Sequence, residues 1–267
     1  MEFGVVGGDR RFAYLTKQLC DCGRDARAIG GVEENGLSLP SADWAALTSA
    51  QRVVVNWPIP DGEMLLQGLS KGTKVFFCGP KGPQWVPEGI EAIDLWKDEK
   101  LLLENAWLTA EGAVSAAMQA MTASVRESRF LVIGWGRIGR ALTEILIGMS
   151  AQVTVASRTE KGRHQAMERG ADCVSTADLK QALRGKRVIF STPPVPVLEQ
   201  AALEQIEKNA LIIDLASPPY GVNLKAAESL GLRAWREPGM PGRYCPESAG
   251  EALLRAILRS ELNGRTV

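Results

Sequence analysis

The chain has 267 residues, 45% hydrophobic and 23% charged, which suits a protein that buries a core and has room for two domains. Its 31 basic residues balance 31 acidic ones, so no net charge favours binding to nucleic acid or to an anionic membrane. No apolar run reaches the ~20 residues that span a bilayer, and the start lacks a signal-peptide pattern. With an odd number of cysteines, 5, at scattered spacings, we expect a cytoplasmic protein with reduced thiols and no metal site.

Short apolar runs alternate with helical patterns along almost the whole chain, which is typical of parallel α/β architecture. Strands are predicted in the first half at 3–6, 25–29, 52–57, 73–78 and, more weakly, 90–95, with helices at 11–22 and 62–70. A long helix of small residues is predicted to begin at Thr109 as its N-cap. A second series of strands follows at 130–133, 152–156, 187–190, 211–215 and 232–235, and an amphipathic helix ends the chain.

This pattern predicts two Rossmann-like α/β domains with parallel sheets, linked by long helices. We expect an N-terminal substrate domain at 1–108, a connecting helix at 109–127 and a dinucleotide-binding domain at 128–245. The helix at 246–267 is expected to pack back on the N-terminal domain.

The segment Gly134-Trp135-Gly136-Arg137-Ile138-Gly139 has the G-x-G-x-x-G spacing between a predicted strand and a predicted helix. In this context the first glycine permits a tight turn, the second lets a pyrophosphate approach, and the third allows close helix packing. The helix N-terminus then supplies N–H groups and a positive dipole end to the phosphates. The segment predicts a dinucleotide site, the alternative being a glycine-rich turn without a ligand.

The next strand ends in Ser157-Arg158-Thr159, where an NAD site usually has a carboxylate. An arginine flanked by hydroxyls suits a 2′-phosphate, so the segment favours NADP over NAD, unless Arg158 is merely a solvated loop residue. Strand ends farther along, carrying Thr192 with Pro193 and Asp214 with Ser217, are predicted to line the ribose and nicotinamide.

Three further segments are candidates for the substrate site. Gly8, Asp9 and Arg11 follow the first strand and could bind a carboxylate, although Asp9 could equally be an N-cap. Glu111, near Thr109, could be an acid–base group or only a first-turn dipole partner. Arg243 and Ser248 lie at the entry to the final helix, another candidate anion pocket. The single histidine, His164, lies in a charged stretch, so we expect no catalytic histidine.

Taken together, these segments resemble the family formed by the A subunits of dipicolinate synthase. The resemblance rests on 6–9 with Arg11, Thr109 with 111–112, 133–139, 214–217, and 238–242 continuing to 248–250, in the same order. The arrangement also looks like that of D-2-hydroxyacid dehydrogenases without their histidine. The sequence departs from the family pattern at Arg10, Phe12, Ser191 and Glu247.

The resemblance implies oxidation of a dihydrodipicolinate to pyridine-2,6-dicarboxylate with hydride transfer to NADP, during sporulation and in the mother-cell cytoplasm. It implies that Arg11 and Arg243 bind the substrate carboxylates and that Glu111 transfers or orients a proton, with Gly8, Asp9, Thr109 and Ser248 beside the substrate. The expected partners are the flavoprotein-like B subunit of dipicolinate synthase and further copies of this chain, as a homo-oligomer. The alternatives are another NADP-dependent dehydrogenase of a small carboxylate, and a non-catalytic NADP-binding regulatory subunit.

Overall fold

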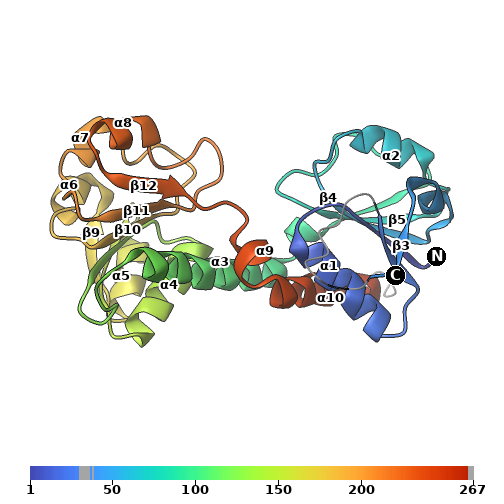
Figure 1. Ribbon diagram of the computed structural model, residues 1–267, viewed down its shortest axis with the longest axis horizontal. Helices are drawn as coiled ribbons and strands as arrows, with labels where there is room; N and C mark the ends of the chain where they lie inside the picture. Colours follow the sequence, from blue (N-terminus) through green and yellow to red (C-terminus); the bar gives the residue numbers. More distant parts are fainter. Residues whose placement is uncertain (30–36, 38, 264–267) are drawn as a thin grey trace. The chain divides into compact units, whose positions relative to one another are not determined.

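The computed structural model describes residues 1–29, 37 and 39–263, and divides them into two compact units (Figure 1). Unit 1 contains 1–105 together with the C-terminal segment from 241, and unit 2 contains 106–240. Each unit is built on its own parallel sheet of six strands. The expectation of a two-part α/β protein with Rossmann-like parallel sheets is confirmed.

The sheet of unit 1 has the order β3-β2-β1-β4-β5-β6. Its strands are β1 (Phe3–Val6), β2 (Ala26–Ile29), β3 (Ser41–Ala42), β4 (Arg52–Asn56), β5 (Lys74–Cys78) and β6 (Glu91–Asp94). Its helical segments are α1 (Arg10–Asp21), the 3₁₀ helix η1 (Trp44–Ser49), α2 (Gly62–Gly68), the 3₁₀ helix η2 (Leu95–Lys97) and α10 (Pro246–Asn263). The short α9 (Met240–Tyr244) leads into α10.

Alternation along the strands gives unit 1 two apolar layers, one on each face of the sheet. On β4, Val54 joins the layer that contains residues of α1 and α10. Its neighbours Val53 and Val55 join the other layer, with Leu47 of η1 and Leu66 of α2. The C-terminal helix therefore completes the core of the N-terminal unit.

Helices α1 and α10 lie side by side, as Figure 1 shows. A methyl group added at Gly250 of α10 would meet the backbone of α1 at 2.9 Å from Leu15 N and 3.0 Å from Arg11 O. The glycine is therefore what allows the two backbones to approach so closely.

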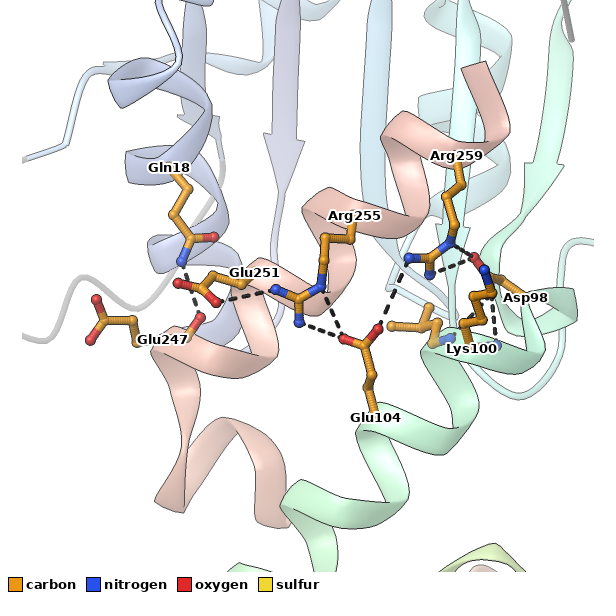
Figure 2. Close-up of polar contacts among 9 residues, drawn as sticks. Gln18, Asp98, Lys100, Glu104, Glu247, Glu251, Arg255 and Arg259 are labelled. Carbon is orange, nitrogen blue, oxygen red and sulfur yellow. Dashed lines mark hydrogen bonds and ion pairs between the residues drawn. The ribbon is translucent and has the colours of Figure 1, made fainter. Parts of the chain in front are cut away.

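Charged side chains also join α10 to the beginning of α3 (Glu99–Ala120), as Figure 2 shows. Arg255 lies 2.5 Å from a carboxylate oxygen of Glu104, and Arg259 lies 2.7 Å from Asp98. Asp98 also accepts hydrogen bonds from the first amides of α3, including Leu101 N at 3.1 Å.

The helix predicted at 109–127 is wrong in its bounds, because α3 begins ten residues earlier, at Glu99, and ends at Ala120. Asp98 supplies the N-terminal hydrogen bonds, at 2.9 Å to Lys100 N. Thr109 is consequently a buried residue of the helix interior and not an N-cap. Glu111 likewise lies inside the helix and not in its first turn.

The sheet of unit 2 has the order β12-β11-β10-β7-β8-β9. Its strands are β7 (Arg129–Ile133), β8 (Gln152–Ser157), β9 (Asp172–Ser175), β10 (Val188–Ser191), β11 (Leu211–Asp214) and β12 (Arg233–Arg236). Its helical segments are most of α3, then α4 (Arg137–Gly148), α5 (Glu160–Met167), the 3₁₀ helix η3 (Thr176–Asp178), α6 (Leu179–Ala182), α7 (Gln200–Leu203) and α8 (Leu224–Ser229). If β7 is counted as the first strand of the unit and β12 as the sixth, the order is 6-5-4-1-2-3. Read from the opposite edge it is 3-2-1-4-5-6, the order of dinucleotide-binding Rossmann sheets.

Candidate functional site

The glycine-rich loop joins β7 to α4 at the carboxyl end of the sheet. Gly134 has a φ of +100° and lies against Thr192 and Pro193, so its backbone conformation and its neighbours both exclude a side chain. Gly139 lies against the carbonyl oxygen of Gly134, which requires the same absence of a Cβ. An added Cβ at Gly136 would meet nothing within 4 Å. The open glycine is thus the one over which a ligand can approach.

The N-terminus of α4 suits an anion. Gly136 occupies the N-cap without a side-chain hydrogen bond, and the first turn of this 12-residue helix contains no acidic residue. The first-turn amides and the positive end of the helix dipole therefore suit a phosphate. By contrast, Thr159 caps α5 and Glu160 lies in its first turn. These features of α4 fit a dinucleotide pyrophosphate, with Arg137 and Ile138 in the first turn beside it.

Trp135 supports the loop from its buried side. The indole is only 9% exposed, and its Nε1 donates a hydrogen bond of 3.1 Å to Gln165 of α5. The guanidinium groups of Arg140 and Arg169 lie 5.9 and 5.7 Å from its ring, within cation–π range. An added Cβ at Gly162 would lie 3.2 Å from the indole. Trp135, which the sequence placed among the cofactor ligands, is therefore a contact between the loop and α5.

The three residues at the end of β8 have different surroundings. Ser157 is 3% exposed, and its hydroxyl lies 3.4 Å from the Thr159 carbonyl oxygen. The Thr159 hydroxyl accepts a hydrogen bond of 3.1 Å from Gly162 N and so caps α5. Arg158 is exposed, while Arg163 donates a hydrogen bond of 3.0 Å to the Ser157 carbonyl. Arg158 and Thr159 are both exposed, but the Thr159 hydroxyl caps α5, which leaves Arg158 as the charged side chain of the three that a ligand can reach.

Asp214 was predicted to line the cofactor, but its carboxylate organises the loop that follows β11. The side chain has no exposed surface and accepts hydrogen bonds from Ala216, Gly221 and Val222 amides at 3.2 to 3.3 Å. Arg236 pairs with it at 3.5 Å. We therefore assign Asp214 to holding residues 215–222 in place. The exposed Ser217 lies within this loop.

Arg236 and Tyr220, near the carboxyl ends of β12 and β11, were not among the residues predicted from the sequence. Arg236 lies over the ring of Tyr220 at 3.8 Å, and Tyr220 has a φ of +71°, a strained conformation for an aromatic residue. Gly221 lies against the buried hydroxyl of Ser191. The Pro-rich, glycine-containing run 218–221 was the available signal that this loop makes a tight turn.

In unit 1 the structure brings together the first and last segments on which the family resemblance rests. Asp9 caps α1 by accepting a hydrogen bond of 3.1 Å from Arg11 N, and its carboxylate pairs with Arg11 Nε at 2.7 Å. Gly242 lies directly against the Asp9 carboxyl group. Gly8 has a φ of +103° and lies against the ring of Phe12. The N-cap alternative for Asp9 is therefore confirmed, with Arg11 as its partner.

The other predicted substrate residues are distributed over both units. Arg243 and Ser248 are exposed in unit 1, with the Arg243 guanidinium 5.6 Å from the ring of Tyr244. Thr109 and the exposed Glu111 belong to unit 2. The described residues contain no group of three or more His, Cys, Asp or Glu that could hold a metal ion.

Comparison with known proteins agrees with this geometry. The profile of the shikimate/quinate 5-dehydrogenase family matches residues 116–229. The A subunit of dipicolinate synthase from Bacillus subtilis (strain 168) is 29% identical over 165 residues, which are 62% of this chain and 56% of that protein. The chain thus aligns with just over half the length of this curated relative.

Solved structures extend the likeness in fold. The dipicolinate synthase A subunit from Bacillus halodurans has a TM-score of 0.83 at 20% identity, covering 97% of this chain and 96% of that one. Its Bacillus subtilis counterpart has a TM-score of 0.79 at 21% identity, covering 99% and 97%. An L-alanine dehydrogenase has a TM-score of 0.67 at 14% identity, covering 97% and 88%.

The fold and the glycine-rich loop define a dehydrogenase-like α/β protein with a site of the nicotinamide-dinucleotide type. The particular protein that it resembles, in sequence over part of its length and in fold over nearly all of it, is the A subunit of dipicolinate synthase. No helix among the described residues is long and apolar enough to cross a membrane.

Proposed function

We propose that this chain is an NADP-dependent oxidoreductase that converts a dihydrodipicolinate to pyridine-2,6-dicarboxylate. The observation that carries the proposal is the resemblance to the dipicolinate synthase A subunit. The dinucleotide loop supports it, because nothing lies within 4 Å of an added Cβ at Gly136 and no side chain caps the helix α4 that follows. From the same resemblance, we further propose that this chain acts in the mother-cell cytoplasm of a sporulating bacterium. The proposed partners are the flavoprotein-like B subunit of the synthase and further copies of this chain.

The cofactor proposal rests on Gly136 and Arg158. The pyrophosphate lies over Gly136, at the positive N-terminal end of α4. The exposed guanidinium of Arg158 pairs with the 2′-phosphate, a partner that NAD lacks. Thr192 and Pro193, packed on Gly134, and the exposed Ser217 line the ribose and nicotinamide end.

The substrate proposal assigns the two ring carboxylates to Arg11 and Arg243, with Gly8, Asp9 and Ser248 of the same unit beside them. Because Arg11 already pairs with Asp9, its guanidinium is held at the start of α1 before substrate arrives. The oxidation removes a hydride and a proton from the dihydropyridine ring and leaves an aromatic pyridine. NADP supplies the hydride acceptor, and Glu111 takes or directs the proton.

The test is a coupled assay with the product of dihydrodipicolinate synthase and NADP, with and without a candidate B subunit, reading the formation of pyridine-2,6-dicarboxylate. We expect product with NADP and much less with NAD. The Arg158→Glu variant should raise the KM for NADP by roughly ten- to a hundredfold and leave that for NAD nearly unchanged. Glu111→Gln should lower kcat and leave the affinity for NADP nearly unchanged.

Each arm of the assay can overturn a different part of the proposal. Equal effects of Arg158→Glu on both cofactors would contradict the 2′-phosphate assignment. Unchanged turnover in Glu111→Gln would remove that residue from the mechanism. Turnover of 2-hydroxy acids in place of dihydrodipicolinate would identify another dehydrogenase of a small carboxylate. Tight NADP binding with no product, even with the B subunit present, would identify a non-catalytic regulatory protein.

A further inference from the structure

Unit 1 contains a cavity of about 680 Å³, whose lining includes Gly8 of the proposed substrate site and none of the other residues assigned to the reaction. The end of β1, the helices η1 and α2 and the loop after β4 all contribute to its lining. The residues that line it are Val6, Gly7, Gly8, Trp44, Leu47, Thr48, Ile59, Pro60, Asp61, Met64, Leu65, Gly68 and Leu69. This volume lies within the range of small-molecule sites, roughly 300–1,000 Å³.

The topology of the sheet places this cavity where an α/β fold binds ligands. In the order β3-β2-β1-β4-β5-β6, the chain runs from β1 outward through β2 and β3. It then returns to the other side of β1 to form β4, β5 and β6. The carboxyl ends of β1 and β4 are therefore the point where the strand order reverses. Val6 and Gly7 end β1 at this point, and Ile59 follows β4. In open α/β sheets the ligand lies in the crevice at such a point.

The lining selects the chemistry of the ligand. Most of the side chains are aliphatic or aromatic, and two large ones at the rim, Trp44 and Met64, are 50% and 65% exposed. The one charged lining residue is the carboxylate of Asp61, and no lysine or arginine lines the cavity among the described residues. An anion placed here would be desolvated without a cationic partner.

The adjacent helix N-terminus does not change this charge balance. The first amides of α1 follow Gly8, which borders the cavity, but the carboxylate of Asp9 caps them. Arg11, the nearest cation along the chain, is paired with that same carboxylate at 2.7 Å. Arg11 does not line the cavity, so it does not offset the negative charge of Asp61 there.

We propose that this cavity is a second ligand site, which takes a flat aromatic ring that is neutral or positively charged. The ring lies between Trp44 of η1 and Leu65 of α2, where it buries apolar surface. A cationic substituent faces Asp61 at the mouth. The site discriminates against anions, because no lysine or arginine among the described residues lines it.

The test uses three ligands of one shape and different charge: 2-naphthamidine, 2-naphthamide and 2-naphthoate. Calorimetric titration of the full chain is expected to give tightest binding for the cationic amidine, then the amide, with the carboxylate weakest. Asp61→Asn should weaken the amidine about two- to fivefold and leave the amide unchanged, as expected for an exposed ion pair. Asn tolerates the left-handed backbone that Asp61 adopts, at a φ of 54°.

Two more variants make the result specific. Met64→Arg places a cation at the exposed rim and should reverse the order, so that the carboxylate binds more tightly than the amidine. Glu63→Gln removes an acidic residue of α2 outside the lining and should change the amidine affinity less than Asp61→Asn does. Thermal melts check that each variant is folded.

The proposal is overturned if none of the three ligands binds, or if the carboxylate binds the unaltered chain as tightly as the amidine. It is also overturned if Asp61→Asn and Met64→Arg both leave the affinities unchanged. NADP binding and dihydrodipicolinate turnover are measured in parallel and should be unaffected by Asp61→Asn. If the unaltered chain neither binds NADP nor turns over dihydrodipicolinate, the proposed function is contradicted. The order of affinities among the three naphthyl ligands still tests this site in that case.

Discussion

The buried carboxylate of Asp214 offers the sharpest test of how unit 2 is held together. Its two oxygens accept hydrogen bonds from the amides of Ala216, Gly221 and Val222 and pair with Arg236. The Asp214→Asn substitution keeps the shape of the side chain, but it replaces one carboxylate oxygen by an NH2 group. That group is a donor and faces the backbone N–H groups, which are donors as well. The negative charge opposite Arg236 is lost as well. The perturbation thus removes the electrostatics of the loop anchor without creating a cavity.

The magnitude follows from the burial of the carboxylate. Removing one partner of a buried charged pair costs about 3–5 kcal/mol, because the groups left behind are no longer compensated. The side chain of Asp214 has no exposed surface, whereas that of Arg236 is 36% exposed and can regain water. We therefore expect Asp214→Asn to destabilise unit 2 by about 3 kcal/mol, at the low end of that range.

The assay is hydrogen exchange read by mass spectrometry, combined with urea unfolding. We expect the amides of Ala216, Gly221 and Val222 to exchange faster in Asp214→Asn, because they lose their acceptor. Asp172→Asn, at an exposed position on β9, is the matched control and should change stability by no more than about 0.5 kcal/mol. A loss below about 1 kcal/mol with unchanged exchange at 215–222 would refute the anchoring role.

Three further predictions follow from the two units. Burial raises the pKa of Asp98, but hydrogen bonds from Arg259 and two backbone amides outweigh this and hold it below its ordinary 3.8. Its stabilising effect is present above pH 3.8 and is lost as the pH falls below that value through the lowered pKa. The difference in unfolding free energy between the unaltered chain and Asp98→Asn should therefore narrow as the pH is lowered below 3.8, and a difference that does not narrow would contradict this. Burial raises the pKa of the Cys78 thiol to about 12, so it should stay unmodified by a disulfide reagent at pH 8 until urea unfolds the chain. Gly139→Ala should cost about 1–3 kcal/mol of stability through its contact with the loop backbone. Gly136→Ala should keep stability within ~1 kcal/mol but weaken NADP at least about tenfold, and equal stability losses would contradict the assignment.

Local features of the molecule were predictable from the sequence because their causes are local. The glycine spacing at 134–139 requires a strand before it and a helix after it, and β7 and α4 stand there. Short continuous apolar runs predicted the central strands, whose side chains are buried on both faces of the sheet. The strand β9 was missed because its residues are exposed or only half-buried, so its apolar pattern is weak.

Long-range partners were not predictable. Asp214 is an acidic residue at a strand end, and the sequence pattern cannot distinguish a ligand contact from an acceptor for amides up to eight residues away. Thr109 has a residue type that is common at N-caps. However, Asp98 accepts the hydrogen bonds of the first amides of α3, and Thr109 is buried in the interior of that helix. The proximity of Gly242 to Asp9 likewise depends on α10 packing against α1.

The sequence by itself therefore determined the class of fold, two parallel α/β units, and the place of the dinucleotide loop. Strand periodicity and glycine stereochemistry act within a few residues, so they can be read along the chain. Only the tertiary structure decided which polar side chains are buried and hydrogen-bonded within the fold, as Asp214 is, and which face solvent, as Arg158 does. It also revealed the apolar cavity of unit 1, because burial and cavity shape arise only when distant segments pack together.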